Sequence, residues 1–367
     1  MADDLVLWIV VATALAFDFT NGFHDTANAV ATSISTRALS PRLAVSLAAI
    51  LNFAGAFISL EVAATIASGI VDAGLVTPTI VFAGLVGAIA WNLATWYFGL
   101  PSSSSHALIG GVVGSAFVAE GSEAVFGSGI VDKVVVPALV APLLAFLVGG
   151  LAILVAYRIV GRQRPGPVVR GFRLGQLVSA SLLALSHGTN DAQKTMGIIF
   201  LALVANGTLA ADADVPTWVV VSAAAAIALG TYAGGWRIIR TMGSRIIKMD
   251  PAQGFAAQGV GAAVIMAASH VGFPLSTTHV ISGAIMGTGA AKRVSAVRWG
   301  VAGNIVTAWV LTLPAAAFVG GVTYALVALL GTDDVGPIAV CASLLVALAI
   351  VLLRRLGGDG RTLTARG

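Results

Sequence analysis

Pro101-Ser-Ser-Ser-Ser-His106 returns later in the chain as Pro274-Leu-Ser-Thr-Thr-His279, at an offset of 173 residues. A second pair of motifs, Gly22-Phe-His-Asp25 and Gly188-Thr-Asn-Asp191, follows in the same order at an offset of 166 residues. Because two different motifs recur in one order and at similar offsets, the sequence predicts an internal duplication. A repeat of this length points to a protein built from two related halves.

The composition indicates that the chain lies in a lipid bilayer. Of its 367 residues, 58% are hydrophobic and 10% are charged, and the mean hydropathy is +0.96. A soluble domain carries about 25% charged residues, so a soluble protein of this size could not cover its surface. The sequence therefore predicts an all-α polytopic membrane protein. Apolar runs near or above the roughly 20 residues that span a bilayer occur at 43–66, 137–157, 305–330 and 338–353.

The charge of the connecting loops alternates along the chain. Basic residues gather at 37–42, 158–173, 237–248 and 292–298 and from 354 onward, whereas acidic residues occur near 72, 120–132, 212–214 and 333–334. The positive-inside rule places the basic loops in the cytoplasm, so we expect the N-terminus outside and the C-terminus in the cytoplasm. Because the basic residues flank membrane spans, they do not indicate a nucleic acid partner. The single cysteine, Cys341, excludes a disulfide framework or a cysteine-based metal site.

Equivalent loops of the two copies carry opposite charge. The basic loop at 37–42 corresponds to the acidic loop at 212–214, and the acidic loop at 72 corresponds to the basic loop at 240–248. Opposite sides for equivalent loops define an inverted-topology repeat, which many secondary transporters have. We expect four regions: an N-terminal transmembrane repeat at 1–157, a basic cytoplasmic linker at 158–173, a C-terminal inverted repeat at 174–330, and an extra transmembrane helix with a basic cytoplasmic tail at 331–367.

Polar residues interrupt the first apolar stretch. The motif Asp18-Phe-Thr-Asn-Gly-Phe-His-Asp-Thr-Ala-Asn28 contains residue types that are poor in helix interiors and good at caps. It predicts a helix broken at mid-membrane, with carboxylate and amide oxygens directed into a cavity where they bind Na⁺ or carry protons. Ser186-His-Gly-Thr-Asn-Asp-Ala-Gln-Lys-Thr195 predicts the equivalent break. In the alternative interpretation, these groups only cap a kink and pair with one another.

The Ser/Thr motifs predict two re-entrant half-helices. Each follows a span, begins with proline and continues into a glycine-rich apolar segment of about 12 residues, which is too short to cross. Proline suits the first helical turn and Ser/Thr suit the cap. A helix N-terminus presents free N–H groups and a partial positive charge, so two such tips at the midplane could hold a tetrahedral oxyanion. The alternative is a pair of capped kinks, because Ser/Thr clusters also hold membrane helices together.

Charged and polar side chains inside a membrane are costly and often functional. Lys194 could neutralise an anion or pair with Asp191 or Asp25. His106 and His279 could orient hydroxyls, relay protons or only pack. The remaining charged residues in apolar stretches are Asp18 and Glu61, and the intramembrane amides, for which packing hydrogen bonds are the default interpretation, are Asn52, Asn92 and Asn304.

Together, the four motifs resemble the signatures of the inorganic phosphate transporter (PiT) family, in order, over roughly residues 5–330. The resemblance implies a symporter of the cell membrane, not an enzyme, that imports inorganic phosphate by alternating access around a midplane site and needs no cofactor. It implies that phosphate binds at Ser103, Ser104, Ser105, Thr277, Thr278, Asn28, Asn190 and Lys194, and that the coupling cation binds at Asp25, Asn28, Asn190 and Asp191.

The coupling ion is H⁺ or Na⁺ in this interpretation. Sodium-coupled animal members of the family tend to carry glutamate where this chain has Gln258 and Ala64, whereas bacterial proton-coupled members are similar to it at the glutamine. Na⁺ at Asp25 and Asp191 would be the one metal site. The family also includes carriers of metal–phosphate complexes and of sulfate, and a passive anion channel is a further alternative. The expected partners are phosphate, the cation and the lipid bilayer, and a homodimer stays open as the assembly.

Overall fold

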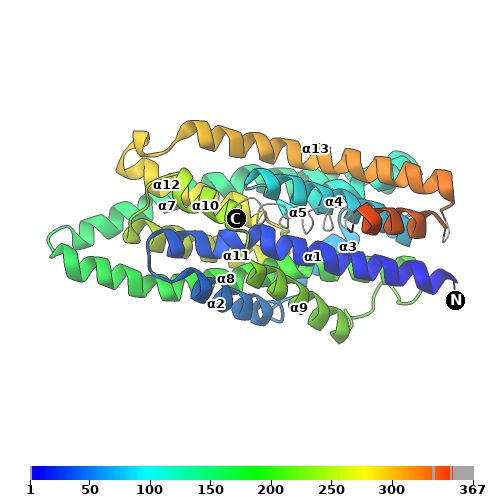
Figure 1. The fold of residues 1–367 in the computed structure, drawn as a ribbon, viewed down its shortest axis with the longest axis horizontal. Helices are drawn as coiled ribbons and strands as arrows, with labels where there is room; N and C mark the ends of the chain where they lie inside the picture. Colours follow the sequence, from blue (N-terminus) through cyan, green and yellow to red (C-terminus); the bar gives the residue numbers. More distant parts are fainter. Residues whose placement is uncertain (1, 333–334, 348, 350–367) are drawn as a thin grey trace, which may run out of the picture.

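The computed structural model describes residues 2–332, 335–347 and 349, and this part of the chain is an all-α bundle (Figure 1). Five of its helices are long and apolar enough to cross a membrane, and a bent helix pair makes a sixth candidate. The all-α polytopic architecture expected from the composition is therefore confirmed.

The same order of elements occurs twice. Each half has a long helix, a broken helix pair, a further helix, a shorter helix and a final long helix. The first half contains α1 (Ala2–Ser35), α2 (Pro41–Gly55), α3 (Glu61–Ser68), α4 (Pro78–Phe98), α5 (Ser104–Glu120), α6 (Gly127–Ile130) and α7 (Val136–Val160). The second contains α8 (Pro165–Ala205), α9 (Thr217–Ala233), α10 (Trp236–Arg240), α11 (Pro251–His270), α12 (Thr277–Lys292) and α13 (Trp299–Leu330). The inverted orientation of the halves stays a prediction.

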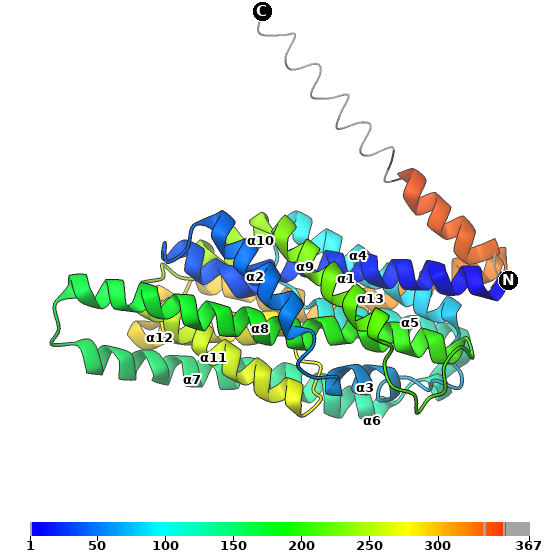
Figure 2. The same ribbon diagram turned by 90° about the horizontal axis from the view of Figure 1, so that it is seen from below.

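The segments at the domain boundaries are mostly helical. α7 and α8 form a hairpin that joins the halves (Figure 2), and only residues 161–164 lie between these helices. Residues 335–347 form an apolar helix where the extra transmembrane helix is expected. The basic tail expected from residue 354 onward lies outside the described residues. The four boundaries derived from the sequence stay predictions.

The broken helices are present, but not at the two motifs where the sequence placed them. α1 runs without interruption through residues 18–28, and α8 runs through residues 186–195. The breaks lie instead between α2 and α3 and between α9 and α10, where the helix pair bends by 58°. A break at mid-membrane would leave backbone groups without partners in an apolar medium, and polar side chains can use their own helix instead. Thr26 Oγ1, for example, donates to Gly22 O at 2.7 Å.

Two shorter helices, α5 and α12, follow the Ser/Thr motifs as expected. They have 17 and 16 residues and begin after the N-caps Ser103 and Ser276, whose hydroxyls accept from His106 N at 3.1 Å and His279 N at 3.3 Å. The caps agree with the expectation, but the prolines do not. Both prolines lie two residues before the cap, in the loop that leads into the helix and outside its first turn.

Glycines explain how the two halves hold each other. α5 packs along α13 of the second half, and α12 packs along α7 of the first. A Cβ atom on Gly114 would overlap the backbone of Ala317, and one on Gly287 would overlap the backbone of Phe146. Small residues let membrane helices approach this closely. Each short helix is therefore held by the last long helix of the other half.

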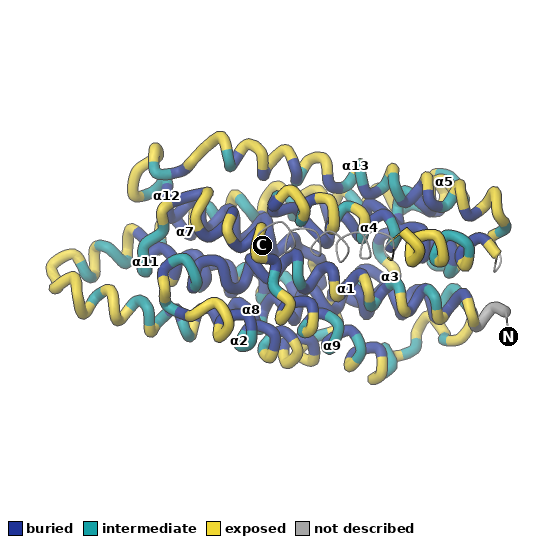
Figure 3. Tube along the Cα trace, viewed as in Figure 1, coloured by how far each residue is buried: buried dark blue, intermediate teal, exposed yellow. Residues whose placement is uncertain are grey.

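The outer surface of the bundle suits lipid. Exposed leucines recur every four residues along α7, and they include Leu139, Leu143, Leu147 and Leu151, each more than 60% exposed. This spacing forms a stripe on one helix face. Figure 3 shows the buried residues concentrated in the middle of the bundle and the exposed ones on its outer helices and ends. In a bilayer the exposed leucines contact acyl chains.

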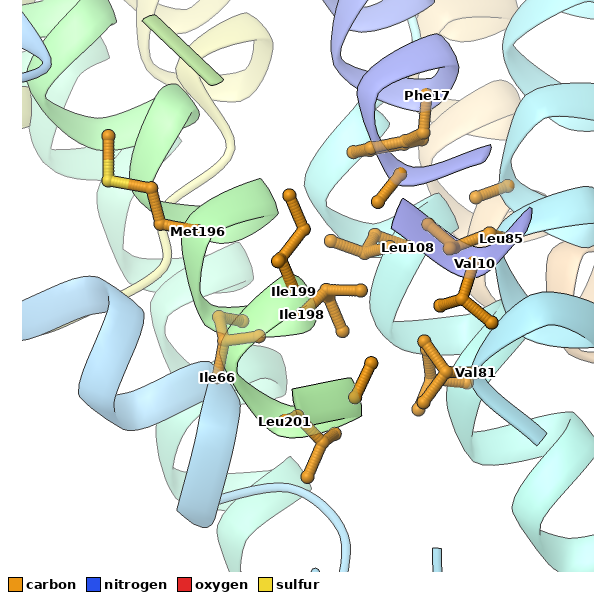
Figure 4. Close-up of a cluster of buried hydrophobic side chains, with 14 of the residues drawn as sticks. Val10, Phe17, Ile66, Val81, Leu85, Leu108, Met196, Ile198, Ile199 and Leu201 are labelled. Carbon is orange, nitrogen blue, oxygen red and sulfur yellow. The ribbon is translucent and has the colours of Figure 1, made fainter. Parts of the chain in front are cut away.

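Two apolar clusters lie on either side of the polar motifs. One cluster contains Phe17, Leu108 and Met196 and is contributed by α1, α3, α4, α5 and α8 among other elements (Figure 4). The other cluster contains buried residues of α1 between Ala27 and Ala31 and of α8 between Ala180 and Ala184, together with residues of other helices. The polar residues of both long helices therefore lie between two apolar layers.

Candidate functional site

The α1 motif reaches the tip of α12. Asn28 Nδ2 donates to Thr277 Oγ1 at 3.0 Å and to Thr278 Oγ1 at 2.9 Å. Thr278 Oγ1 also donates to Asp25 Oδ1 at 3.3 Å. All four side chains are at most 2% exposed. Residues that are about 250 positions apart in the chain thus form one closed polar cluster.

The α8 motif reaches the tip of α5 through Lys194. Its ammonium group donates to Ser105 Oγ at 2.5 Å, to Asp191 Oδ1 at 2.6 Å and to Leu275 O at 2.9 Å. Ser105 Oγ itself donates to Leu275 O at 3.1 Å, so the α5 tip contacts the segment that leads into α12. Lys194 therefore bridges both tips and pairs with Asp191 rather than with Asp25.

The repeat offset relates these two bridging residues. At the offset of 166 that joins Asp25 to Asp191, Asn28 corresponds to Lys194. Asn28 contacts the α12 tip and Lys194 contacts the α5 tip. Each long helix therefore directs one donor at the start of a short helix, α12 or α5, but only one of these donors is charged.

Two carboxylates face each other across the cluster. Asp25 Oδ1 lies 2.7 Å from His24 Nδ1, and Asp191 Oδ2 lies 3.1 Å from His187 Nε2. Ligand atoms of Asp25, His187 and Asp191 lie within 4.8 Å of one another. A carboxylate–imidazole–carboxylate group of this size has the chemistry to hold a cation.

The remaining site residues lie in the same buried region. Ser103 and Ser104 are at most 1% exposed at the start of α5. Asn190 Nδ2 does not reach a tip and donates instead to Ser269 Oγ at 2.9 Å and Phe273 O at 3.3 Å, on and after α11. Asn28 Oδ1 and Asn190 Oδ1 have no hydrogen-bond partner within the described part of the chain. These two amide oxygens are free to bind a ligand.

The tip histidines are used for packing. The rings of His106 and His279 meet edge to face with centroids 4.8 Å apart, and His279 stacks on Trp309 at 4.0 Å. The hydrogen bonds of the described residues join neither ring to a tip hydroxyl. Of the three interpretations left open by the sequence, packing has the direct contacts.

Some neighbours of the site were not identified from the sequence. Thr95 of α4 accepts from or donates to His24 Nε2 at 3.0 Å, and Ser102 Oγ donates to Thr95 Oγ1 at 2.9 Å. The sequence could not identify the carbonyl group of Leu275, because a backbone acceptor does not depend on the residue type. Thr95 had a weak signal, because it lies one turn after Asn92 in an otherwise apolar helix.

Comparisons with known proteins point to one family. The model of the phosphate transporter family matches residues 21–320. A probable low-affinity inorganic phosphate transporter of Mycobacterium tuberculosis is 58% identical over 327 residues, covering 89% of this chain and 78% of that protein. One of Rhizobium meliloti is 52% identical, covering 86% of this chain and 94% of that protein. A solved structure titled "The sodium-dependent phosphate transporter" matches with a TM-score of 0.80 and 24% identity over 89% of this chain and 99% of its own, which shows the shared fold.

Proposed function

The chain belongs to the phosphate transporter family, and from this membership we propose that it is a secondary active importer of inorganic phosphate. Phosphate transport by a multi-pass protein of the cell membrane, rather than catalysis, follows from the family itself. The proposal adds symport with a cation, alternating access around a midplane site, an external N-terminus and a cytoplasmic C-terminus.

The observation that carries the proposal is the bridge that Asn28 and Lys194 make to the two half-helix starts. The first N–H groups of a helix have no intrahelical partner and carry a partial positive charge. Each capping serine satisfies one of them. Two such starts, together with one ammonium group, suit a tetrahedral oxyanion.

We assign phosphate binding to the tip hydroxyls and to the side chains that reach them. The hydroxyls donate to phosphate oxygens, and Lys194 supplies the positive charge after it leaves Leu275 O. The full set is Ser103, Ser104, Ser105, Thr277, Thr278, Asn28, Asn190 and Lys194, all at most 3% exposed. Since the site is closed to both sides, alternating access has to open one apolar layer at a time.

A coupling cation offsets the charge of this cluster. Phosphate beside Asp25 and Asp191 brings like charges together, and each pair about 5 Å apart costs about 3 kcal/mol at an effective dielectric constant of about 20. We therefore assign the cation to the neighbourhood of Asp25, Asn28, Asn190 and Asp191.

Gln258 favours protons over Na⁺ as the coupling ion. Ser179 Oγ donates to Gln258 Oε1 at 3.0 Å, and Gln258 Nε2 donates to Ser33 Oγ at 2.5 Å. The neutral amide thus has partners on both sides, and its oxygen is occupied by a donor. A site of this kind offers no negative charge to Na⁺.

The group formed by Asp25, His187 and Asp191 favours a second cargo, a neutral complex of phosphate with a divalent metal. Imidazole and carboxylate are suitable ligands for such ions. His187 Nε2 is buried and lies 3.1 Å from Asp191 Oδ2. If this cargo is used, phosphate uptake will rise when a divalent metal is added at constant pH. His187→Ala will then abolish the metal-dependent rise and leave metal-independent uptake unchanged.

The test is uptake of labelled phosphate into proteoliposomes under an imposed proton or Na⁺ gradient. Accumulation above the external concentration under the proton gradient is expected, and simple equilibration would indicate a channel. Excess sulfate should not compete with labelled phosphate, and strong competition would indicate a general oxyanion carrier. Accumulation driven by Na⁺ alone would contradict proton coupling.

A further inference from the structure

Asp18 is a buried intramembrane acid that the phosphate site does not use. It lies on α1, seven residues before Asp25, and is 0% exposed. Neither of its carboxylate oxygens has a hydrogen-bond partner within the part of the chain that the structure describes. Asp25 and Asp191, in contrast, both lie against histidine or lysine nitrogens. Asp18 therefore differs from the other two acids in having no bonded cationic group.

Other unpartnered polar atoms surround this carboxyl group. Asn21 and Thr195 are the polar side chains beside it, and Asn21 Oδ1 and Thr195 Oγ1 are buried without a hydrogen bond. Asn92 of α4 has neither amide atom bonded. Asn21 and Asn92 each lie three residues before His24 and Thr95, whose side chains contact each other. Asn21 of α1 and Thr195 of α8 therefore place unpartnered atoms beside Asp18, and Asn92 lies on a helix that packs against α1.

The next layer is apolar. Phe17 precedes Asp18 in the chain and Met196 follows Thr195, and both belong to the buried cluster that also contains Leu108 (Figure 4). All three side chains are 0% exposed. An ionised carboxylate in such surroundings, without a hydrogen bond or a paired cation, is strongly unfavourable. A neutral carboxylic acid is not, and its O–H group can donate to Asn21 Oδ1 or Thr195 Oγ1.

We propose that Asp18, with Asn21 and Thr195, forms a second site that carries the coupling proton as a carboxylic acid. This inference rests on the proposed proton-coupled import and names the residue that carries the proton. An O–H bond forms on Asp18 when the site takes a proton from water on one side. The same bond breaks when the proton returns to water on the other side.

The charged groups that face Asp18 connect this site to phosphate. They are Asp191 and Lys194, both on α8. α4 and α9, which also pack against α1, carry no charged residue, and on α1 itself His24 and Asp25 lie about two turns further on. When Lys194 turns to phosphate, Asp191 loses its partner and its negative charge faces Asp18. Phosphate binding then favours the protonated acid, so the two ligands bind together.

Asp18→Asn tests the site, because the amide has the same shape and cannot carry a proton. With the membrane potential held at zero, a gradient of one pH unit supports about a tenfold accumulation of phosphate for each coupled proton. We expect wild-type protein to reach this level and Asp18→Asn to stay near equilibration. Exchange of internal for external phosphate, which needs no net proton movement, should persist in Asp18→Asn. Asp18→Glu should restore accumulation.

Three outcomes would overturn the proposal. The first is accumulation by Asp18→Asn at the wild-type level. The second is that Asp18→Asn loses both exchange and accumulation, which would make Asp18 part of the phosphate site or of the packing. The third is wild-type accumulation under a Na⁺ gradient alone.

An infrared measurement on the purified protein separates this site from the transport function. The C=O stretching band of a protonated carboxylic acid should be present near neutral pH in wild-type protein and in Asp25→Asn, and absent in Asp18→Asn. If wild-type protein neither exchanges nor accumulates phosphate, the proposed function fails, and the band still decides whether Asp18 holds a proton. A spectrum in which Asp18→Asn removes no such band overturns the inference.

Discussion

Replacing Lys194 by methionine removes the ammonium group that joins both half-helix tips and keeps most of the side-chain volume. Lys194 is 1% exposed and lies 2.6 Å from Asp191 Oδ1, which is 0% exposed. Removing one partner of a buried ion pair costs about 3–5 kcal/mol, because the remaining charge stays buried and unpaired. We expect Lys194→Met to lower the free energy of unfolding in mixed micelles by this amount. The same change should weaken phosphate binding about 10- to 100-fold, since a charged hydrogen bond contributes about 1.5–3 kcal/mol.

A double variant and a surface control separate charge from packing. Lys194→Met with Asp191→Asn removes both charges, so the double variant should be more stable than Lys194→Met alone, although both variants should bind phosphate more weakly than the wild-type protein. Lys292 pairs with Asp250 at 3.1 Å, but these side chains are 54% and 32% exposed. Lys292→Met should therefore cost no more than about 1 kcal/mol. If the double variant were as unstable as the sum of the two single changes, the assignment of a buried ion pair would be refuted.

Three further predictions concern packing, capping and ion preference. Gly114→Ala places a methyl group against the backbone of Ala317 and should destabilise the protein by about 1–3 kcal/mol in thermal unfolding, whereas Gly300→Ala, which meets nothing within 4 Å, should not. Ser103→Ala removes an N-cap and should cost about 0.5–2 kcal/mol and raise the KM for phosphate; an unchanged KM would argue against a role for the α5 tip. Gln258→Glu places a carboxylate between two serine hydroxyls, so added Na⁺ should stimulate uptake at constant pH, and Na⁺-independent uptake would contradict the role given to the amide.

The sequence predicted the architecture well where it depends on the length of apolar segments and on helix capping. Apolar length set the spans, and the Ser/Thr motifs marked the two capped short helices. The position of the helix breaks was wrong because helix propensities measured in water were applied inside a membrane. In that medium an unpaired backbone group costs more free energy than a residue of low helix propensity inside a helix, so α1 and α8 stay continuous.

The contents of the site were predictable, but not its pairing. The motifs placed Asp25, Asp191 and Lys194 at similar depth, and Lys194 could have paired with either carboxylate. The partner of Lys194 depends on the register between α8 and the segment before α12, where Leu275 O accepts one of its protons. A backbone acceptor has no side-chain identity, so no sequence pattern could reveal it.

The duplication relates the two halves, but the site departs from symmetry at two positions. At the offset of 166, Asn28 corresponds to Lys194, and Asp18 corresponds to Ala184. The positive charge is therefore only on α8 and the unpaired acid only on α1. Because Asp191 lies against Lys194 and is one of the charged groups near Asp18, the charge of this carboxylate would transmit the effect of phosphate to the proposed proton site. In the proposed mechanism, the departure at Asp18 provides the proton site, and the departure at Lys194 provides the charge that links phosphate to it.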